Sequence, residues 1–129
     1  MKIRAVLSVL VATAWISISE FARNEFLLKS YWTSHYEKLG LVFPSEPING
    51  AFWGIWSLVF AAVIYVISRK FTLMQTSLLA WVLGFVMMWL VVWNLSVLPV
   101  QILALAIPLS MLEAFLASYI LIAMNKNNQ

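Results

Sequence analysis

The stretch GAFWGIWSLVFAAVIYVIS, residues 50–68, contains no charged residue and is followed directly by Arg69 and Lys70. A helix of about 20 apolar residues is long enough to cross the hydrocarbon core of a bilayer, which is roughly 30 Å thick. Basic residues at one end of such a helix are typical of a membrane span. The stretch therefore predicts that lipid, and not water, surrounds this part of the chain.

The rest of the chain has the same character. Of its 129 residues, 64% are hydrophobic and 10% are charged, whereas about a quarter of the residues of a soluble domain are charged. Three further apolar segments are long enough to cross a membrane: about residues 5–28, 74–93 and 98–124. The sequence predicts an all-α fold, an integral membrane bundle of four transmembrane helices. It would be a single domain over 1–129, with an extracytoplasmic loop at about 29–49.

Basic residues near the ends of the spans predict the orientation. Four spans bring the two termini and the turn after residue 68 to one side of the membrane. That side carries Lys2, Arg4, Arg69, Lys70 and Lys126, and the other carries Arg23, Lys29 and Lys38 together with Glu25, Glu37 and Glu46. This bias predicts that both termini are cytoplasmic. The small size suggests a bacterial inner membrane protein.

Two local patterns shape the loop and the last span. Ser34 and Glu37 have the spacing of a capping box, which predicts a short interfacial helix that begins there and is closed by Gly40. Asn49 is a suitable cap for the second span. Pro108 lies inside the fourth span and is expected to kink it.

Small and polar residues recur at steps of three and four along each span, which places each set on one helix face. The sets are Thr13, Ser17, Glu20 and Asn24; Gly50, Gly54, Ser57 and Ala61; Thr76, Ala80, Gly84, Met87, Val91 and Asn94; and Ala106, Ser110, Glu113 and Ala117. Helices in lipid associate where small residues let their backbones approach and where polar groups bond across. We expect a compact bundle with these faces turned inward.

The most informative charged residues are Glu20, Arg23 and Glu113, which fall inside predicted spans. At 1.5 Å per residue, Glu20 lies about 24 Å and Glu113 about 18 Å above the inner boundary, and Arg23 can reach down toward both. We therefore expect a Glu20–Arg23–Glu113 cluster in the outer half of the membrane. The secondary partners would be Asn24, Asn94 and Ser110.

This predicted cluster has two interpretations. Two carboxyl groups around one guanidinium leave an excess negative charge, so we expect one carboxyl to stay protonated, with the deeper Glu113 as the better candidate. The cluster would either fix the packing of the helices or form a ligand-binding or proton-binding site. The protein would accordingly be a non-enzymatic structural or accessory membrane protein, or alternatively a small transporter or ligand-binding membrane protein.

The composition gives little support for metal binding, catalysis or nucleic-acid binding. The chain has no cysteine and one histidine, His35, and it lacks aspartate, so the sequence predicts neither a metal site nor a cofactor, and no catalytic motif favours an enzyme. The eight Lys and Arg residues are explained by membrane topology, which argues against nucleic acid as a partner. The expected partners are the lipid bilayer and either a second copy of the chain or another membrane protein.

In architecture, the size, the four spans and the glutamate in the first span resemble the small multidrug resistance transporters. In that family the essential glutamate lies near the middle of the first span. Glu20 lies later in its span, with Arg23 one turn away, and the long 29–49 connection and Pro108 also depart from the family pattern. The resemblance implies a four-span fold with a functional glutamate, but no motif of the family is matched.

Overall fold

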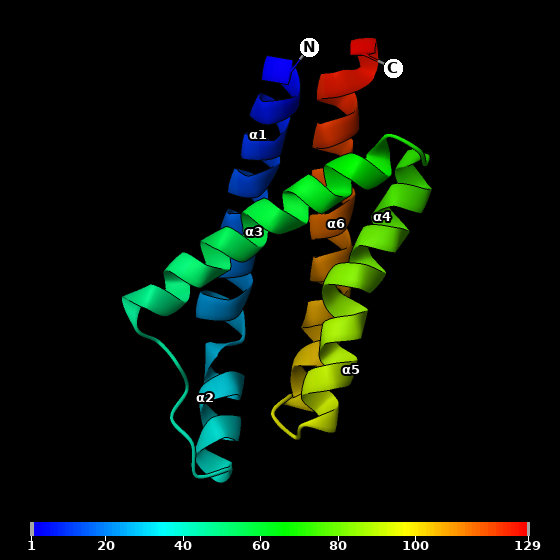
Figure 1. Ribbon diagram of the computed structural model, residues 1–129. Helices are drawn as coiled ribbons and strands as arrows, with labels where there is room; N and C mark the ends of the chain where they lie inside the picture. Colours follow the sequence, from blue (N-terminus) through cyan, green and yellow to red (C-terminus); the bar gives the residue numbers. More distant parts are fainter. Residues whose placement is uncertain (1, 129) are drawn as a thin grey trace.

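The computed structural model describes residues 2–128, which form helices joined by turns and one longer connection (Figure 1). The helices of the four apolar stretches are α1 (Lys2–Phe21), α3 (Pro47–Ser68), α4 (Leu73–Trp81), α5 (Met87–Asn94) and α6 (Leu103–Asn125). A more polar helix, α2 (Lys29–Lys38), follows the first of these stretches, and a 3₁₀ turn, η3 (Val100–Ile102), precedes α6. The all-α bundle predicted from the sequence is confirmed.

Four helical stretches among residues 2–128 are long and apolar enough to cross a membrane. They are Lys2–Leu27, Pro47–Ser68, Leu73–Asn94 and Val100–Asn125, so each differs from its predicted span by no more than a few residues. These four apolar helices are what a small membrane protein requires. Their side chains face outward over much of their length because lipid, unlike water, does not drive apolar groups inward.

The helix α6 is central to the bundle, since it packs against α1, α3 and α4. In Figure 1, α3 runs diagonally in front of α1 and α6. The helices α4 and α5 follow one another as a nearly continuous helix beside α6. Both termini and the α3–α4 turn lie at one end of the bundle, and α2 lies at the other end. The up-and-down order of the four predicted spans is therefore present.

Hydrogen bonds at the helix ends explain where α3 and α4 begin. Thr72 Oγ1 accepts from the Gln75 N–H at 3.3 Å and Gln75 Oε1 accepts from the Thr72 N–H at 3.1 Å, which is a complete capping box. Pro47 opens α3, where its missing N–H costs little. Asn49 lies inside the first turn of α3, not before it, and its Oδ1 accepts from the N–H of Glu46 at 3.0 Å.

The predicted start of the interfacial helix at Ser34 was wrong. Ser34 lies in the middle of α2, which begins at Lys29 and follows the first span after a break at Leu28. The end was predicted correctly: Gly40 has a φ of +71°, the left-handed conformation that glycine adopts without strain, directly after the helix. The Ser34 and Glu37 spacing was misleading because a hydroxyl caps a helix only where the preceding chain is not already helical.

Two segments within residues 2–128 are π-helical: η1 (Ala22–Leu27), at the end of the first span, and η2 (Val82–Val86), between α4 and α5. The wider i→i+5 turn of a π-helix inserts a residue and rotates the faces that follow. In the third span, Thr76 and Ala80 are buried as expected, but within the π-helix Phe85 is buried, and directly after it Met87 is exposed. Gly84 still packs against Phe60, but the inward face predicted for Met87, Val91 and Asn94 was wrong, since all three are exposed.

The inward faces of the other spans were predicted unevenly. On α6, the expected set Ala106, Ser110, Glu113 and Ala117 is buried throughout. On α1, the buried residues are Ser8, Ala12, Ile16 and Glu20, so Thr13 and Ser17 lie beside the buried face and not on it. On α3, Ser57 and Ala61 are buried, but Gly50 and Gly54 are exposed and a Cβ built on either meets no atom within 4 Å.

Candidate functional site: a buried charged cluster

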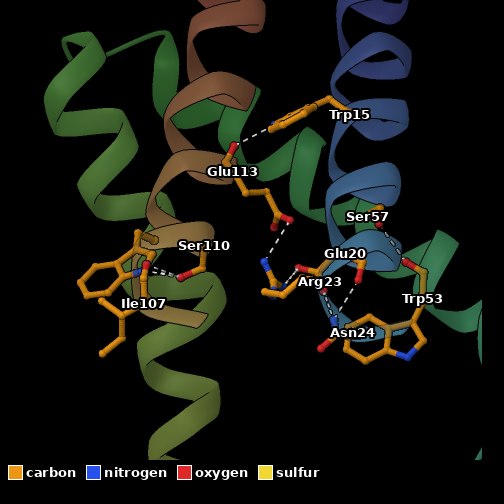
Figure 2. A network of polar contacts seen from close by, with 10 residues as sticks. Trp15, Glu20, Arg23, Asn24, Trp53, Ser57, Ile107, Ser110 and Glu113 are labelled. Atoms are coloured by element: carbon orange, nitrogen blue, oxygen red, sulfur yellow. Dashed lines mark hydrogen bonds and ion pairs between the residues drawn. The ribbon is translucent and has the colours of Figure 1, made fainter. Parts of the chain in front are cut away.

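The structure brings Glu20, Arg23 and Glu113 into contact, and we call these three residues the charged cluster (Figure 2). Arg23 Nη2 donates to Glu20 Oε1 at 2.6 Å, and Arg23 Nη1 lies 3.4 Å from Glu113 Oε1. The guanidinium thus bridges two carboxyl groups, one from a residue 3 positions away in the sequence and one from a residue 90 positions away. The meeting of these residues, predicted from their depths, is confirmed.

The register of α1 against α6 brings the three residues of the charged cluster to the same level. At the terminal end of the bundle, Asn125 Nδ2 donates to Ser8 Oγ at 2.8 Å. From that contact to the charged cluster both helices advance by the same twelve residues, from Ser8 to Glu20 on α1 and from Asn125 to Glu113 on α6. At 1.5 Å per residue each helix covers about 18 Å, so two antiparallel helices can make both contacts without distortion.

The charged cluster is closed off from the surface of the bundle. Glu113 has no exposed surface, and Glu20 and Arg23 are 5% and 6% exposed. A charged side chain at the middle of a membrane costs about 2.5–3.5 kcal/mol on insertion scales, and such groups persist only when they are paired. The three residues therefore have to be understood as one paired unit and not as separate groups.

The predicted secondary partners differ in where they lie. Asn24 joins the cluster, because its Nδ2 donates to Glu20 Oε2 at 3.0 Å and to the Glu20 carbonyl at 3.1 Å. Ser110 is buried on the same face of α6 but bonds elsewhere: it accepts from Trp81 Nε1 at 2.9 Å and donates to the Ile107 carbonyl at 3.0 Å. Asn94 ends α5, is exposed, and makes no contact with the cluster within residues 2–128.

Two aromatic residues complete the site, and neither was identified from the sequence. The Arg23 guanidinium carbon lies 5.2 Å from the centre of the Phe85 ring, a cation–π contact. Trp15 Nε1 donates to the backbone carbonyl of Glu113 at 3.0 Å. Arg23 lies in η1 and Phe85 in η2, so this cation–π contact joins the two π-helical segments. Since π-helical turns often mark functional positions, they single out this level of the bundle.

Grooves on the outside of the bundle do not lead to the charged cluster. One groove, of about 590 Å³, lies between α3 and the η2–α5 segment and is lined by apolar residues that include Trp56, Phe60 and Met87. Another, of about 330 Å³, lies between α4 and α6 and is lined by residues such as Met74, Trp81 and Phe115. Neither lining includes a residue of the charged cluster. Because the linings are mostly apolar, both grooves suit acyl chains rather than polar ligands.

His35, considered above for metal binding, has a structural partner. Its Nε2 lies 2.8 Å from the carbonyl oxygen of Ser96, and since a carbonyl only accepts, Nε2 carries the hydrogen. The bond ties α2 to the turn between α5 and α6. Among the described residues, no group of three or more His, Asp or Glu side chains could hold a metal ion.

Comparison with known proteins gives no family to which the site can be referred: no family model matches the chain, and neither a curated protein nor a solved structure shows a significant match. The function therefore has to be argued from the geometry of the site. Its features are three buried charged side chains, their bridging geometry and the apolar surroundings.

Proposed function

We propose that this chain is a non-enzymatic membrane protein of structural or accessory type, in which the charged cluster holds α1 against α6. One observation carries the proposal: the three charged side chains are almost entirely buried and are bonded to one another. A substrate site would need a polar route from one side of the membrane, whereas the two grooves described above are apolar. A bridging guanidinium that joins two helices fixes their register.

The proposal includes a location and an orientation. The protein would be a multi-pass protein of a bacterial inner membrane with both termini in the cytoplasm. The end of the bundle with the termini carries basic residues without acids, namely Lys2, Arg4, Arg69, Lys70 and Lys126. This is the distribution that the positive-inside rule expects on the cytoplasmic side.

The orientation can be tested by labelling cysteines, because the chain has none of its own. Ser34→Cys, in α2, and Lys126→Cys, at the other end of the bundle, are compared in intact cells with a membrane-impermeant maleimide. We expect Ser34→Cys to be labelled and Lys126→Cys to be labelled only after lysis. The reverse pattern would place the termini outside and overturn the proposed orientation.

An accessory protein needs a partner, and the end of the bundle that carries α2 is the surface we propose for it. Between α2 and α3 the chain has no helix over residues 41–46, and Val42 in this connection is 91% exposed. Phe43 anchors the connection, since its ring lies 6.0 Å from Trp32 and 5.2 Å from Tyr36, measured between ring centres. The proposed partner is another membrane protein or a second copy of the chain.

The alternative is a small transporter or ligand-binding protein that uses the same cluster. One observation favours it: within residues 2–128, no donor reaches Glu113 Oε2, although the atom is buried. A carboxyl oxygen that is left without a partner inside a membrane is a place where a proton or cation could bind. The alternative differs from the accessory role in requiring that this group exchange with water on both sides.

Flux measurements separate the two. The purified protein and its Glu113→Gln variant are reconstituted into vesicles that contain a pH-sensitive dye, and a pH gradient is imposed with either Na⁺ or K⁺ present. For an accessory protein we expect the same slow dye response from both and from protein-free vesicles. Dye acidification that the wild-type chain accelerates and Glu113→Gln abolishes would overturn the accessory role in favour of transport.

A further inference from the structure

The charges of the cluster do not balance if both glutamates are ionised. Two carboxylates and one guanidinium carry a net charge of minus one, and the packed elements supply no further cation, because residues 47–68 and 73–94 contain no Lys, Arg or His. On α1 and α6 the other charged residues lie near the terminal end of the bundle, at Lys2 and Arg4. An uncompensated charge in so apolar an interior costs several kcal/mol and is normally removed by protonation.

The hydrogen bonds indicate which carboxyl group holds the negative charge. Glu20 accepts from Arg23 at 2.6 Å and from Asn24 at 3.0 Å, so both of its carboxyl oxygens have donors. Glu113 has one long contact, 3.4 Å from Arg23 to Oε1, while no donor in residues 2–128 reaches Oε2. Donors stabilise the ionised form of a carboxyl group, and the geometry therefore favours ionisation of Glu20 over Glu113.

We infer that the charged cluster is a proton-binding site that holds one proton on Glu113 Oε2 at neutral pH, with Glu20 as the ionised member of the pair. Both carboxyl groups contact the same guanidinium, at 2.6 Å for Glu20 and 3.4 Å for Glu113, so the Glu113 hydroxyl would have Glu20 as the nearest acceptor. Arg23 then neutralises Glu20, and the cluster is electrically neutral as a whole. Both glutamates gain a partner that the unprotonated arrangement lacks.

A bound cation such as Na⁺ is a poorer explanation for the missing charge. Hard cations need several oxygen ligands, and this site offers one carboxyl oxygen that has no partner. A proton needs only one oxygen to bind and one to accept its hydrogen bond. The inference does not depend on the proposed function, because the proton would be held both in an accessory protein and in a transporter. The vesicle experiment tests the function, and the infrared spectra test the proton, so either result can be negative without the other.

Infrared spectra of the reconstituted protein test this inference, because a protonated carboxyl group has a C=O stretching band that a carboxylate lacks and that shifts in D₂O. We expect the wild-type band to correspond to one protonated carboxyl group at neutral pH. Glu113→Gln removes it by removing the group. Glu20→Gln removes it too, because Glu113 is then the sole partner of Arg23 and ionises.

Two further variants sharpen the test. Arg23→Gln takes away the cation and is expected to double the band, since both carboxyl groups are then neutral. Glu25→Gln is the matched control: Glu25 is exposed and pairs with Lys29 at 3.0 Å, and its loss should leave the band unchanged. Circular dichroism of each variant shows that the helices are intact, and the two Glu→Gln variants decide the result if Arg23→Gln does not fold.

Several outcomes would overturn the inference. A wild-type spectrum without the band would mean that both glutamates are ionised. A band that persists in Glu113→Gln would assign the proton to another group. A band that weakens at constant pH when NaCl replaces choline chloride would show that the site takes up a cation in exchange for the proton.

Discussion

The α1–α6 interface and the α3–α5 side of the bundle show two ways in which apolar helices meet. Along the α1–α6 interface, alanine and serine residues let the backbones approach, and polar contacts lie near both ends, at Ser8–Asn125 and at the charged cluster. On the other side, α3 and α5 diverge (Figure 1). The groove of about 590 Å³ between them is lined by large side chains.

The difference follows from the solvent. In water, the aromatic side chains between α3 and α5 would be driven together, but in lipid no such force acts between apolar surfaces. Close packing then depends on small residues and on polar groups that have no other partner. Aromatic contacts among Trp56, Phe60 and Phe85 join α3 to the third span, where Gly84 lets the Phe60 ring approach its backbone.

The largest effect is expected from Arg23→Ala, which breaks the α1–α6 interface at the charged cluster. It leaves Glu20 and Glu113 without their shared cation and removes the contact with Phe85. Loss of one partner from a buried ion pair costs about 3–5 kcal/mol. Unfolding in mixed micelles with increasing SDS, followed by circular dichroism, measures the change in the free energy of unfolding.

Lys29→Ala is the control for Arg23→Ala, because Lys29 forms an exposed pair with Glu25 at 3.0 Å. Exposed pairs contribute about 0–1 kcal/mol, so this variant should unfold nearly like the wild type. Equal effects of the two substitutions would mean that the charged cluster does not hold the interface together.

Gly84→Ala should disrupt a close approach on the α3 side, between Gly84 and the Phe60 ring. A Cβ at this position would lie 2.6 Å from Cζ of Phe60, whose ring is packed against Trp56 and Phe85. Overpacking of this kind typically costs about 1–3 kcal/mol. In the same SDS titration, Phe60→Leu should restore part of the loss, and strict additivity of the two changes would show that the ring is not what Gly84 accommodates.

Asn125→Ala probes the neutral contact at the other end of the α1–α6 interface. It removes the hydrogen bond to Ser8, and interhelical bonds in membranes average about 0.6 kcal/mol. We expect a loss of that size, well below the effect of Arg23→Ala, while Asn127→Ala, at an exposed position beyond α6, should have none. A loss as large as that of Arg23→Ala would mean that ionic and neutral contacts stabilise this interface equally.

The smallest effect is expected from Gly54→Ala, the matched partner of Gly84→Ala. A Cβ on Gly54 meets no atom within 4 Å, and alanine favours a helix over glycine by up to about 1 kcal/mol. The free energy of unfolding should stay the same or rise slightly. A fall in stability together with a change in oligomeric state, measured by light scattering in detergent, would show that this face of α3 packs against a second copy.

The sequence by itself determined the spans, their order and the residues of the charged cluster. An uninterrupted apolar stretch such as 50–68 is expected to be helical in lipid. The bilayer core offers no water to the backbone N–H and C=O groups, and a helix bonds them to one another within the same segment. Charged residues inside such a stretch need partners, and the positions of Glu20, Arg23 and Glu113 along their helices already placed them within reach. Gly40 likewise marked the end of α2 because few other residues adopt its φ without strain.

Only the tertiary structure decided which helix faces turn inward and which aromatic residues complete the site. Hydropathy does not specify the rotation of a helix that is apolar all round, so the exposure of Gly50 and Gly54 could not be foreseen. The π-helical turn at 82–86 brings Phe85, and not Met87, to face Arg23, and the extra residue in that turn leaves no mark in an apolar sequence. Asn94 lies apart from the cluster for another reason: it follows Phe85 by nine residues, which places it about 13 Å further along the helix at 1.5 Å per residue.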